Sequence, residues 1–180
     1  MQLRAFSEKQ RKALTWWCDP ACRDYEGILC DGAVRSGKTM CLSLGFFCWA
    51  MARFHGQQFA LCGRSVGAVR RNLLAPLRGE LEALGFQIRE RVSQNRLEVS
   101  SGGRENRFYL FGGKDESSAG AIQGITLAGA LLDEVALMPR SFVEQAVARC
   151  SVEGARRWMS CNPEGTGHRL YREWVGRAEE

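Results

Sequence analysis

The sequence predicts one α/β domain, a mainly parallel β-sheet with helices on both faces and an antiparallel β insertion. Its 180 residues, 45% hydrophobic and 25% charged, suit a single globular domain. Short apolar runs of strand character alternate with longer runs of helical character, which is typical of parallel strands joined by helices. One stretch instead holds three β-like runs in succession, which indicates antiparallel pairing.

Hydrophobic periodicity and chain-breaking residues place the elements in order. A capping-box pattern at residues 7–10 begins a helix that extends to about residue 17. Strands are expected at residues 27–31, 58–62, 87–91, 96–100, 107–111, 126–132 and 157–160. Further helices are expected at residues 40–54, 65–84, 141–149 and 168–176, the second of them interrupted at Pro76. The strands at 87–91 and 96–100 flank a polar turn and are predicted to form a hairpin.

The net charge of +5 is carried mainly by arginine, which supplies 21 of the 25 basic residues. The basic excess is concentrated in residues 64–107, with nine arginines and five acidic residues. Because the guanidinium group suits phosphate, this segment is consistent with a polyanionic partner. A solvated charged face is the alternative.

The sequence has no feature of a membrane or secreted protein. Its longest apolar stretch, residues 41–52, is too short to cross a bilayer, and the first twelve residues lack the apolar core of a secretory signal. We therefore expect a cytoplasmic protein whose eight cysteines are reduced. Cys18 and Cys22 form a C-x₃-C pair with no second pair nearby, so zinc binding is not favoured.

Residues 32–39 match the phosphate-binding loop G-x-x-x-x-G-K-[ST] in full. The loop follows a predicted strand and begins a predicted helix, which is the context that the motif requires. Gly32 and Gly37 let backbone N–H groups approach the phosphates, and Lys38 reaches the β- and γ-phosphates. The Thr39 hydroxyl is a ligand for Mg²⁺. The sequence therefore predicts a P-loop NTPase.

Asp133 and Glu134 directly follow the apolar strand expected at 126–132. Open α/β sheets bind ligands at the carboxyl ends of their strands. We expect Asp133 to hold Mg²⁺ and Glu134 to orient or deprotonate the attacking water, which indicates NTP hydrolysis rather than a small-molecule kinase. With the P-loop, the pair predicts a RecA-like (ASCE) fold in which the P-loop strand and the Asp133 strand are neighbours. Alone, an Asp-Glu pair is common at strand ends.

A third element comprises residues 158–163, where a strand runs into a turn stopped by proline. If this strand neighbours the Asp133 strand, Ser160 and Asn162 can face the γ-phosphate and sense its presence. The alternative is an ordinary Asn-Pro turn.

These elements, with the sequence between them, resemble the large terminase subunit of tailed bacteriophages, specifically the PBSX type. The resemblance extends from Phe6 to Trp174. It is most specific at residues 31–39, 111–116, 122–129, 133–139, 150–154 and 162–165.

The resemblance implies an ATP-driven, magnesium-dependent motor that packages double-stranded DNA into a procapsid. Implied partners are the DNA, the small terminase subunit, the portal protein and further copies of the chain in a ring, in the cytoplasm of a bacterial host. Family members carry an N-terminal ATPase domain and a C-terminal nuclease domain. We expect residues 1–180 to be the ATPase domain alone, without nuclease activity.

The resemblance also assigns roles residue by residue. Lys38 and Thr39 contact phosphate and Mg²⁺, Asp133 is the Mg²⁺ ligand, and Glu134 is the catalytic carboxylate. Nucleotide-binding positions within the loop are Gly32, Arg35, Ser36 and Gly37, and the coupling motif is Ser160, Cys161 and Asn162.

Gln10 and Arg35 have two interpretations each. Gln10 matches the glutamine that reads the adenine edge in the family, and its alternative is the helix cap already noted. Arg35 matches a loop arginine that acts at the γ-phosphate, and its alternative is a surface arginine.

The sequence departs from the family at Gln123, where several terminases carry an arginine that acts on the ATP of a neighbouring subunit. The candidates for that role here are Arg149, which we favour slightly, Arg140 and Arg64. Each is also explained as a surface or salt-bridging residue.

Two other functions fit the motifs. One is a different hydrolytic P-loop machine, such as a helicase-like DNA-dependent ATPase, although a second RecA-like lobe does not fit in this length. The other is a nucleotide switch without turnover, against which the intact Glu134 argues.

Overall fold

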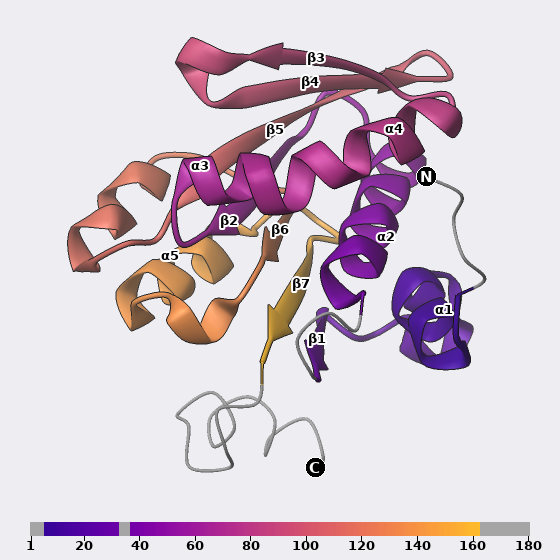
Figure 1. Cartoon of the computed structure of the whole chain (residues 1–180), viewed down its shortest axis with the longest axis horizontal. Helices are drawn as coiled ribbons and strands as arrows, with labels where there is room; N and C mark the ends of the chain where they lie inside the picture. Colours follow the sequence, from indigo (N-terminus) through magenta and orange to yellow (C-terminus); the bar gives the residue numbers. More distant parts are fainter. Residues whose placement is uncertain (1–5, 33–36, 163–180) are drawn as a thin grey trace.

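A computed structural model describes residues 6–32 and 37–162 of the chain (Figure 1). Its core is a seven-stranded sheet with the order β1-β7-β6-β2-β5-β4-β3. The strands are β1 (Gly27–Asp31), β2 (Gln58–Gly63), β3 (Gln87–Arg91), β4 (Arg96–Ser101), β5 (Arg104–Gly112), β6 (Gly129–Leu132) and β7 (Arg156–Cys161). The first five strands in the sheet order are parallel, whereas β4 and β3 continue the sheet as an antiparallel hairpin beside β5.

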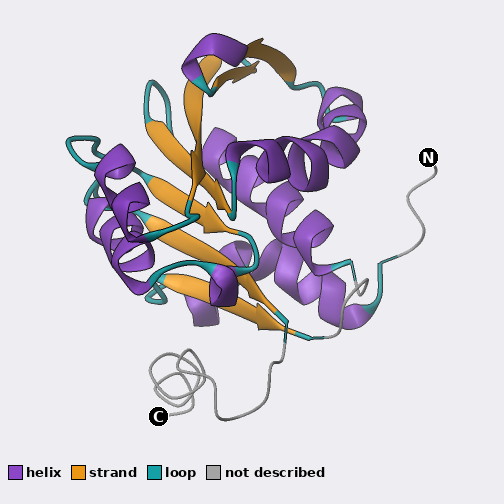
Figure 2. Ribbon diagram, turned by 60° about the vertical axis from the view of Figure 1, so that its left-hand side comes forward, coloured by secondary structure: helices purple, strands orange, loops and turns teal. Residues whose placement is uncertain are grey.

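Helices cover both faces of the sheet (Figure 2). The α-helices are α1 (Glu8–Thr15), α2 (Lys38–Arg53), α3 (Val66–Ala68), α4 (Ala75–Ala83) and α5 (Arg140–Arg149). Short 3-10 segments lie at Trp16–Cys18, Pro20–Cys22, Val92–Gln94, Glu116–Ile122 (η5) and Val135–Leu137 (η6), and a π-helical segment lies at Val69–Leu74. In the part of the chain that the structure describes, no helix is long and apolar enough to span a membrane.

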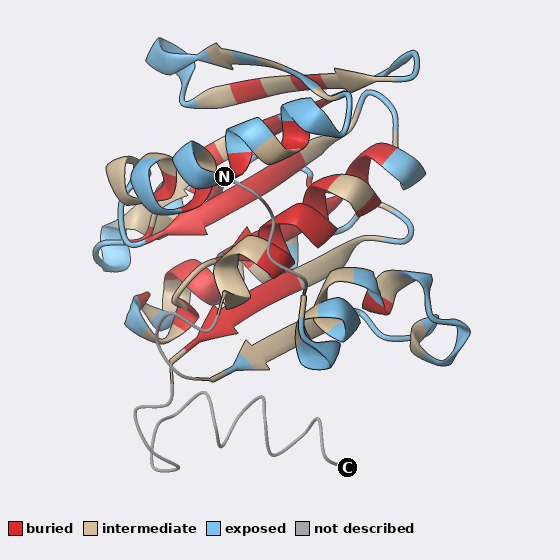
Figure 3. Ribbon diagram, turned by 45° about the vertical axis from the view of Figure 1, so that its right-hand side comes forward, coloured by how far each residue is buried: buried red, intermediate tan, exposed pale blue. Residues whose placement is uncertain are grey.

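The core lies in two layers, one on each face of the sheet. Strand residues alternate between the layers: Phe59 and Leu61 of β2 pack with α2 and α4, whereas Ala60 and Cys62 pack with α5. Figure 3 shows the buried residues concentrated in α2 and the central strands. Aromatic rings dominate the α2 layer, where Phe46 of α2 lies 5.1 Å from Trp158 of β7 between ring centroids. This packing fixes the strand ends on which the predicted site depends.

The structure confirms the predicted α/β sheet and its antiparallel hairpin, with differences in detail. The strand expected at 126–132 is regular only over β6, because Leu127 makes a single isolated bridge to Cys150. The helix expected at 65–84 widens into the π-helical segment just before Pro76, which then lies in the first turn of α4, where its missing N–H is not needed. The helix expected at 168–176 lies outside the described residues.

One expectation about the sheet is wrong. The strand that precedes the P-loop, β1, and the strand that precedes Asp133, β6, are not neighbours, because β7 lies between them and pairs with both. Both strands run parallel to β7, so their carboxyl ends still meet at one edge of the sheet. The expected contact between β7 and the Asp133 strand is confirmed.

Candidate active site

The predicted site residues converge at the carboxyl ends of β1, β6 and β7. Lys38, the first residue of α2, directs its amino group back across the loop, where Nζ donates to the Gly32 carbonyl and lies 3.2 Å from Asn162 Oδ1. Lys38 from the start of the chain and Asn162 from the end of β7 thus meet, although 124 positions separate them. The amino group of Lys38 is held at the position where phosphates would bind.

Gly37 shows why the loop needs glycine directly before Lys38. Its φ of 79° lies in the left-handed region, which side chains disfavour. A β-carbon there would lie 2.7 Å from Nε2 of Gln10. A larger residue at position 37 would therefore be strained by the left-handed backbone and would push the Gln10 side chain aside.

Asp133 is the centre of a hydrogen-bonded group. Its Oδ1 accepts from the Thr39 hydroxyl at 2.9 Å and from the Ser160 hydroxyl at 2.7 Å. Ser160 is 3% exposed, so this part of the site is closed to water on the side of β7. The structure thereby joins α2, β6 and β7 at one carboxylate, as the motifs predict.

Glu134 adopts a backbone conformation that the sequence does not reveal. Its φ of 56° and ψ of 50° are left-handed, which is rare for a residue other than glycine. Its backbone N–H donates to Ser160 Oγ at 2.9 Å, and η6 begins at the next residue, the buried Val135. Ser160 therefore contacts both members of the acidic pair.

The donor set at this site fits Mg²⁺. Thr39 and Asp133 present a hydroxyl and a carboxylate oxygen 2.9 Å apart, and both are hard oxygen ligands. Magnesium in NTPases is held by one or two protein oxygens and completes its shell with phosphate oxygens and water. Within residues 6–32 and 37–162 no group of three His, Cys, Asp or Glu side chains could form a metal cage.

Gln10 serves as the helix cap that its sequence position predicts. Its Oε1 accepts from the Ser7 backbone N–H at 2.9 Å, and Ser7 Oγ accepts from the Gln10 N–H at 3.3 Å, which completes the capping box of α1. The Gln10 side chain also lies beside the P-loop, because its Nε2 is close to Gly37. The contact with adenine stays a prediction.

The described arginines considered for catalysis, Arg64, Arg140 and Arg149, are not part of the hydrogen-bonded group around Asp133. Arg35, like Ser36, lies outside the described residues. Arg149 lies at the far end of α5, where its backbone carbonyl accepts from Leu127 N–H near the amino end of β6. Its guanidinium lies 2.9 Å from the Gln145 amide oxygen in the amide orientation that satisfies both groups. Arg149 is thus at the opposite edge of the sheet from Asp133, and any role on ATP would be toward another chain.

Arg140 and Arg64 lie nearer the carboxyl edge. Arg140 opens α5 and forms an ion pair with Glu144 at 2.5 Å. Arg64 directly follows β2 and is exposed. Gln123, at the position of the family arginine, ends η5 and is also exposed.

Thiols next to the P-loop are withdrawn from water, which the sequence motifs did not predict. Burial raises the pKa of Cys30 to about 11, and it does the same for Cys161. Cys161 Sγ lies 3.6 Å from Asp31 Oδ1, toward which the thiol donates. Cys161 of the predicted coupling motif therefore belongs to the core rather than to the phosphate site.

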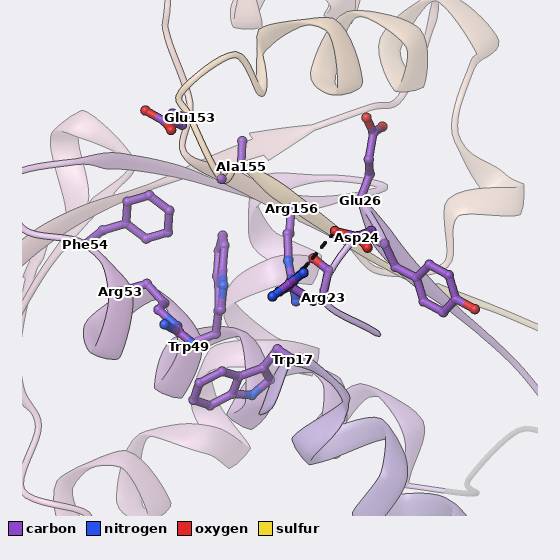
Figure 4. Close-up of a pocket in the computed structure, with 12 residues that line it drawn as sticks. Trp17, Arg23, Asp24, Glu26, Trp49, Arg53, Phe54, Glu153, Ala155 and Arg156 are labelled. Atoms are coloured by element: carbon purple, nitrogen blue, oxygen red, sulfur yellow. Dashed lines mark hydrogen bonds and ion pairs between the residues drawn. The ribbon is translucent and has the colours of Figure 1, made fainter. Parts of the chain in front are cut away.

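A cavity of about 650 Å³ lies at the other edge of the sheet (Figure 4). It opens at the amino ends of β1 and β7 and at the end of α2, and none of the predicted site residues lines it. Its walls combine Trp17 and Trp49 with arginines and acidic residues, among them Arg23 and Asp24 as an ion pair of 3.8 Å. The cavity is separate from the residues that carry the P-loop chemistry.

Comparisons with known proteins agree with this geometry. A family model described as "Terminase large subunit, T4likevirus-type, N-terminal" matches residues 29–180. The large terminase of a thermophilic bacteriophage is 48% identical with a TM-score of 0.93, covering 98% of this chain and 44% of that chain. A comparison with curated protein sequences finds no match.

Two further structures of the same thermophilic-phage large terminase contain nucleotides. The complex with ADP is 46% identical with a TM-score of 0.92, covering 97% of this chain and 43% of that chain. The complex with ATP-γ-S is 45% identical with a TM-score of 0.89, covering 97% and 42%. The present chain thus spans less than half the length of these relatives. The PBSX subtype stays a prediction, but the chain belongs to the terminase large subunit family, through a region matched as its N-terminal part.

Proposed function

We propose that this chain is the ATP-hydrolysing motor domain of a phage large terminase and that it powers translocation of double-stranded DNA into a procapsid. The observation that carries the proposal is the convergence of Lys38, Thr39, Asp133 and Ser160 at one sheet edge. The thermophilic-phage relative, whose structures include ADP and ATP-γ-S complexes, supports ATP as the substrate.

In this mechanism the chain holds the triphosphate from two sides. The Lys38 ammonium, now bonded to the Gly32 carbonyl and Asn162, turns its N–H groups toward the β- and γ-phosphates. Thr39 and Asp133, whose side-chain oxygens already lie 2.9 Å apart, would hold Mg²⁺, and the ion would neutralise charge that develops on the phosphate oxygens.

Glu134 acts on the attacking water. Its left-handed backbone, held by Ser160, turns the chain sharply after β6 so that two consecutive residues serve separate tasks. The carboxylate accepts a proton from water or orients it for attack on the γ-phosphorus, and the β-γ bond breaks to give ADP and phosphate. Ser160 of β7 contacts Asp133, and Asn162, directly after β7, contacts Lys38. β7 thus connects the phosphate-binding lysine with the magnesium ligand and is suited to transmit the loss of phosphate.

The proposed partners follow from family membership. They are double-stranded DNA, the small terminase subunit, the portal protein and neighbouring copies in a ring, in the cytoplasm of an infected bacterium. An arginine from a neighbouring copy, with Arg149 as the favoured candidate, would complete each site; such arginines accelerate hydrolysis about 10³–10⁵-fold.

The Glu134→Gln variant tests this assignment, because the amide keeps the shape of the carboxylate and loses the basic oxygen. We expect ATP affinity within about twofold of the wild type and turnover lower by about 10²-fold or more. Fluorescent-nucleotide titration measures binding, and phosphate release measures turnover, both with and without duplex DNA.

Lys38→Ala is the matched control and should lose nucleotide binding itself. Turnover by Glu134→Gln at the wild-type rate would remove Glu134 from the mechanism. A wild-type chain that binds ATP but never hydrolyses it, even with DNA and the packaging partners present, would favour a nucleotide switch.

A further inference from the structure

Four of the nine arginines in segment 64–107 share two carboxylates within the fold. Arg70 Nε lies 2.9 Å and Arg78 Nη2 3.4 Å from the two oxygens of Glu90, so one carboxylate joins α4 and the π-helical segment to β3. Arg70 also donates to the Val92 carbonyl and to Asn95. These arginines fasten the hairpin to the helical layer, so their side chains have a structural role within the fold.

The same holds for the outer strands. Arg91 and Arg96 lie 3.2 and 2.7 Å from the oxygens of Glu98. Arg104 donates to the backbone carbonyls of Met51 and Ala52 near the end of α2. Several arginines of the segment are therefore engaged within the fold, whereas Arg64 has no carboxylate partner among the described residues.

One cationic pocket lies on the same sheet edge as the candidate active site. Its volume is about 420 Å³, and it is formed where β2 and β5 end. After β2 the chain enters α3 and then the π-helical segment, which packs with α2 and α4 on one face of the sheet. After β5 the chain enters η5, which packs with α5 on the other face. Neighbouring parallel strands whose connections leave to opposite faces open a crevice at their carboxyl ends, a preferred ligand site in open α/β sheets.

The composition of this pocket favours an anion. Arg64 and Lys114 line it, and no acidic residue of the described ranges does. Within the described residues neither side chain has a carboxylate partner. Neutral polar groups complete the lining: Ser65, Gln94, Asn95, Tyr109 and Ser118.

The acidic residues that follow Lys114 are engaged elsewhere. Asp115 caps η5, where its Oδ1 accepts from the hydroxyls of Ser117 and Ser118, and these bonds lower the pKa of its carboxyl group. Glu116 accepts from the Ser141 hydroxyl of α5. Both carboxylates are thus held within η5 and α5 by hydroxyl groups, and in the described part of the chain neither forms an ion pair with Arg64 or Lys114.

We propose that this pocket binds the phosphate backbone of double-stranded DNA and is the DNA contact of this domain. The inference rests on the proposed function and adds the residues: Arg64 and Lys114 each contact a phosphate, and Ser65, Gln94, Asn95 and Tyr109 donate further hydrogen bonds. Such contacts carry no base information, which suits a motor that moves DNA of any sequence.

The pocket is joined to the ATP site by the backbone. The Asp133 N–H donates to the Cys62 carbonyl at 2.9 Å, one residue before the end of β2, and the Gly113 N–H donates to the Gly63 carbonyl at 2.8 Å. Arg64 is therefore two residues from the carbonyl that supports Asp133. DNA bound at Arg64 acts on the magnesium ligand through this short path, so we expect DNA binding and ATP turnover to influence each other.

The test measures duplex binding by the Arg64→Ala/Lys114→Ala variant of the full chain, using fluorescence anisotropy over a range of salt concentrations. We expect the slope of log K against log salt to fall by about two and the affinity at low salt to fall on the order of tenfold, because two phosphate contacts are lost. ATP affinity should not change.

Two further variants make the outcome specific. Arg78→Ala/Lys12→Ala removes the same number of positive charges from residues that already have acidic partners and should keep the wild-type salt slope. Lys114→Ala alone should lower the slope by about one while basal ATP turnover stays at the wild-type value.

The results separate this inference from the proposed function. Equal losses in both double variants, or no loss in the Arg64/Lys114 variant, overturn the pocket assignment and leave the ATPase assignment intact. Failure of the wild type to bind duplex DNA at any salt concentration also overturns it. If the wild-type chain does not bind ATP or does not hydrolyse it, the proposed function itself fails.

Discussion

Ser160 holds the acidic pair in place through one hydroxyl group. Its Oγ donates to Asp133 and accepts from the Glu134 N–H, so it fixes the magnesium ligand and the strained backbone of the catalytic carboxylate together. Ser160 does not itself touch the reacting water in this arrangement and is a positioning residue. Its effect should therefore appear in the rate of the chemical step.

We expect Ser160→Ala to lower kcat for ATP about tenfold or more with a smaller change in KM. The variant leaves the partly buried backbone N–H of Glu134 without a side-chain acceptor, which costs about 1–3 kcal/mol, and it frees the Asp133 carboxylate to rotate. Steady-state phosphate release at several ATP concentrations separates kcat from KM. Ser160→Thr keeps the hydroxyl and should recover most of kcat; equal kcat in all three proteins would contradict the positioning role.

At the scale of residues, the sequence predicts chemistry better than conformation. The motifs identify Lys38, Thr39 and Asp133, and the structure brings their side chains together. The left-handed conformation of Glu134 could not be predicted, because glutamate gives no local signal for it and the support comes from Ser160, 26 positions away.

Among the elements, β6 depends on a close approach to α2. Gly129 begins β6, and a β-carbon there would lie 2.7 Å from Trp49 Cζ3 of α2 and 2.9 Å from the Arg156 carbonyl of β7. The strand that ends at Asp133 is therefore packed directly under a helix whose other end carries Lys38. Its position constrains the distance between the two halves of the site.

Gly129→Ala should destabilise the protein by about 1–3 kcal/mol, since neither neighbour can move without disturbing the core. The matched control is Gly79→Ala in the interior of α4, where a β-carbon would have no heavy atom within 4 Å. That control should stabilise the protein by about 0.4–1 kcal/mol, because alanine favours the helix. Urea unfolding measures both, and a stable Gly129→Ala variant would contradict this packing.

Elements with strong local signals were predictable, and those set by tertiary contacts were not. The hairpin of β3 and β4 and the cap of α1 follow from turn residues and a capping box, and both are confirmed. The π-helical segment before Pro76 and η5 have no comparable signal. Asn106 is similar: it is fully buried in β5 because its amide binds the Ala50 and Phe54 carbonyls at the end of α2.

For the molecule as a whole, the thiols make the free energy of unfolding fall as pH rises through the alkaline range. Burial raises the pKa of Cys30, Cys150 and Cys161 from 9.0 to about 11. The unfolded chain releases these protons first, so the contribution of the thiols is fully present below pH 9.0 and is lost as pH rises toward about 11.

We therefore expect the free energy of unfolding to fall between about pH 9 and about pH 11, and to fall less steeply when the three cysteines are replaced by alanine. Urea unfolding of the reduced protein across this range gives the slope. Cys18→Ala, at an exposed thiol, is the control and should leave the slope unchanged. A triple variant as sensitive to pH as the wild type would assign the effect to other groups.

The fold class was predictable from alternating strand and helix patterns, whereas the strand order was not. Nothing local in residues 156–161 shows that this last strand is inserted between β1 and β6, because that order is set by long-range packing of Trp158 against α2 and Trp16. The same limit applies to the charges: composition identifies a basic segment, but only the structure shows which arginines already have carboxylate partners.

The position of β7 in the sheet also affects the order in which the strands pair during synthesis. β1 leaves the ribosome early, yet among the strands of the described chain its one partner is β7, and Arg157 N–H bonds to the Glu26 carbonyl across more than a hundred residues. During synthesis the P-loop strand must therefore wait, unpaired, until almost the whole sheet has emerged. The nucleotide site is consequently completed among the last steps in the folding of this sheet, because a nascent chain that has not yet reached Arg156 lacks the strand with which β1 pairs.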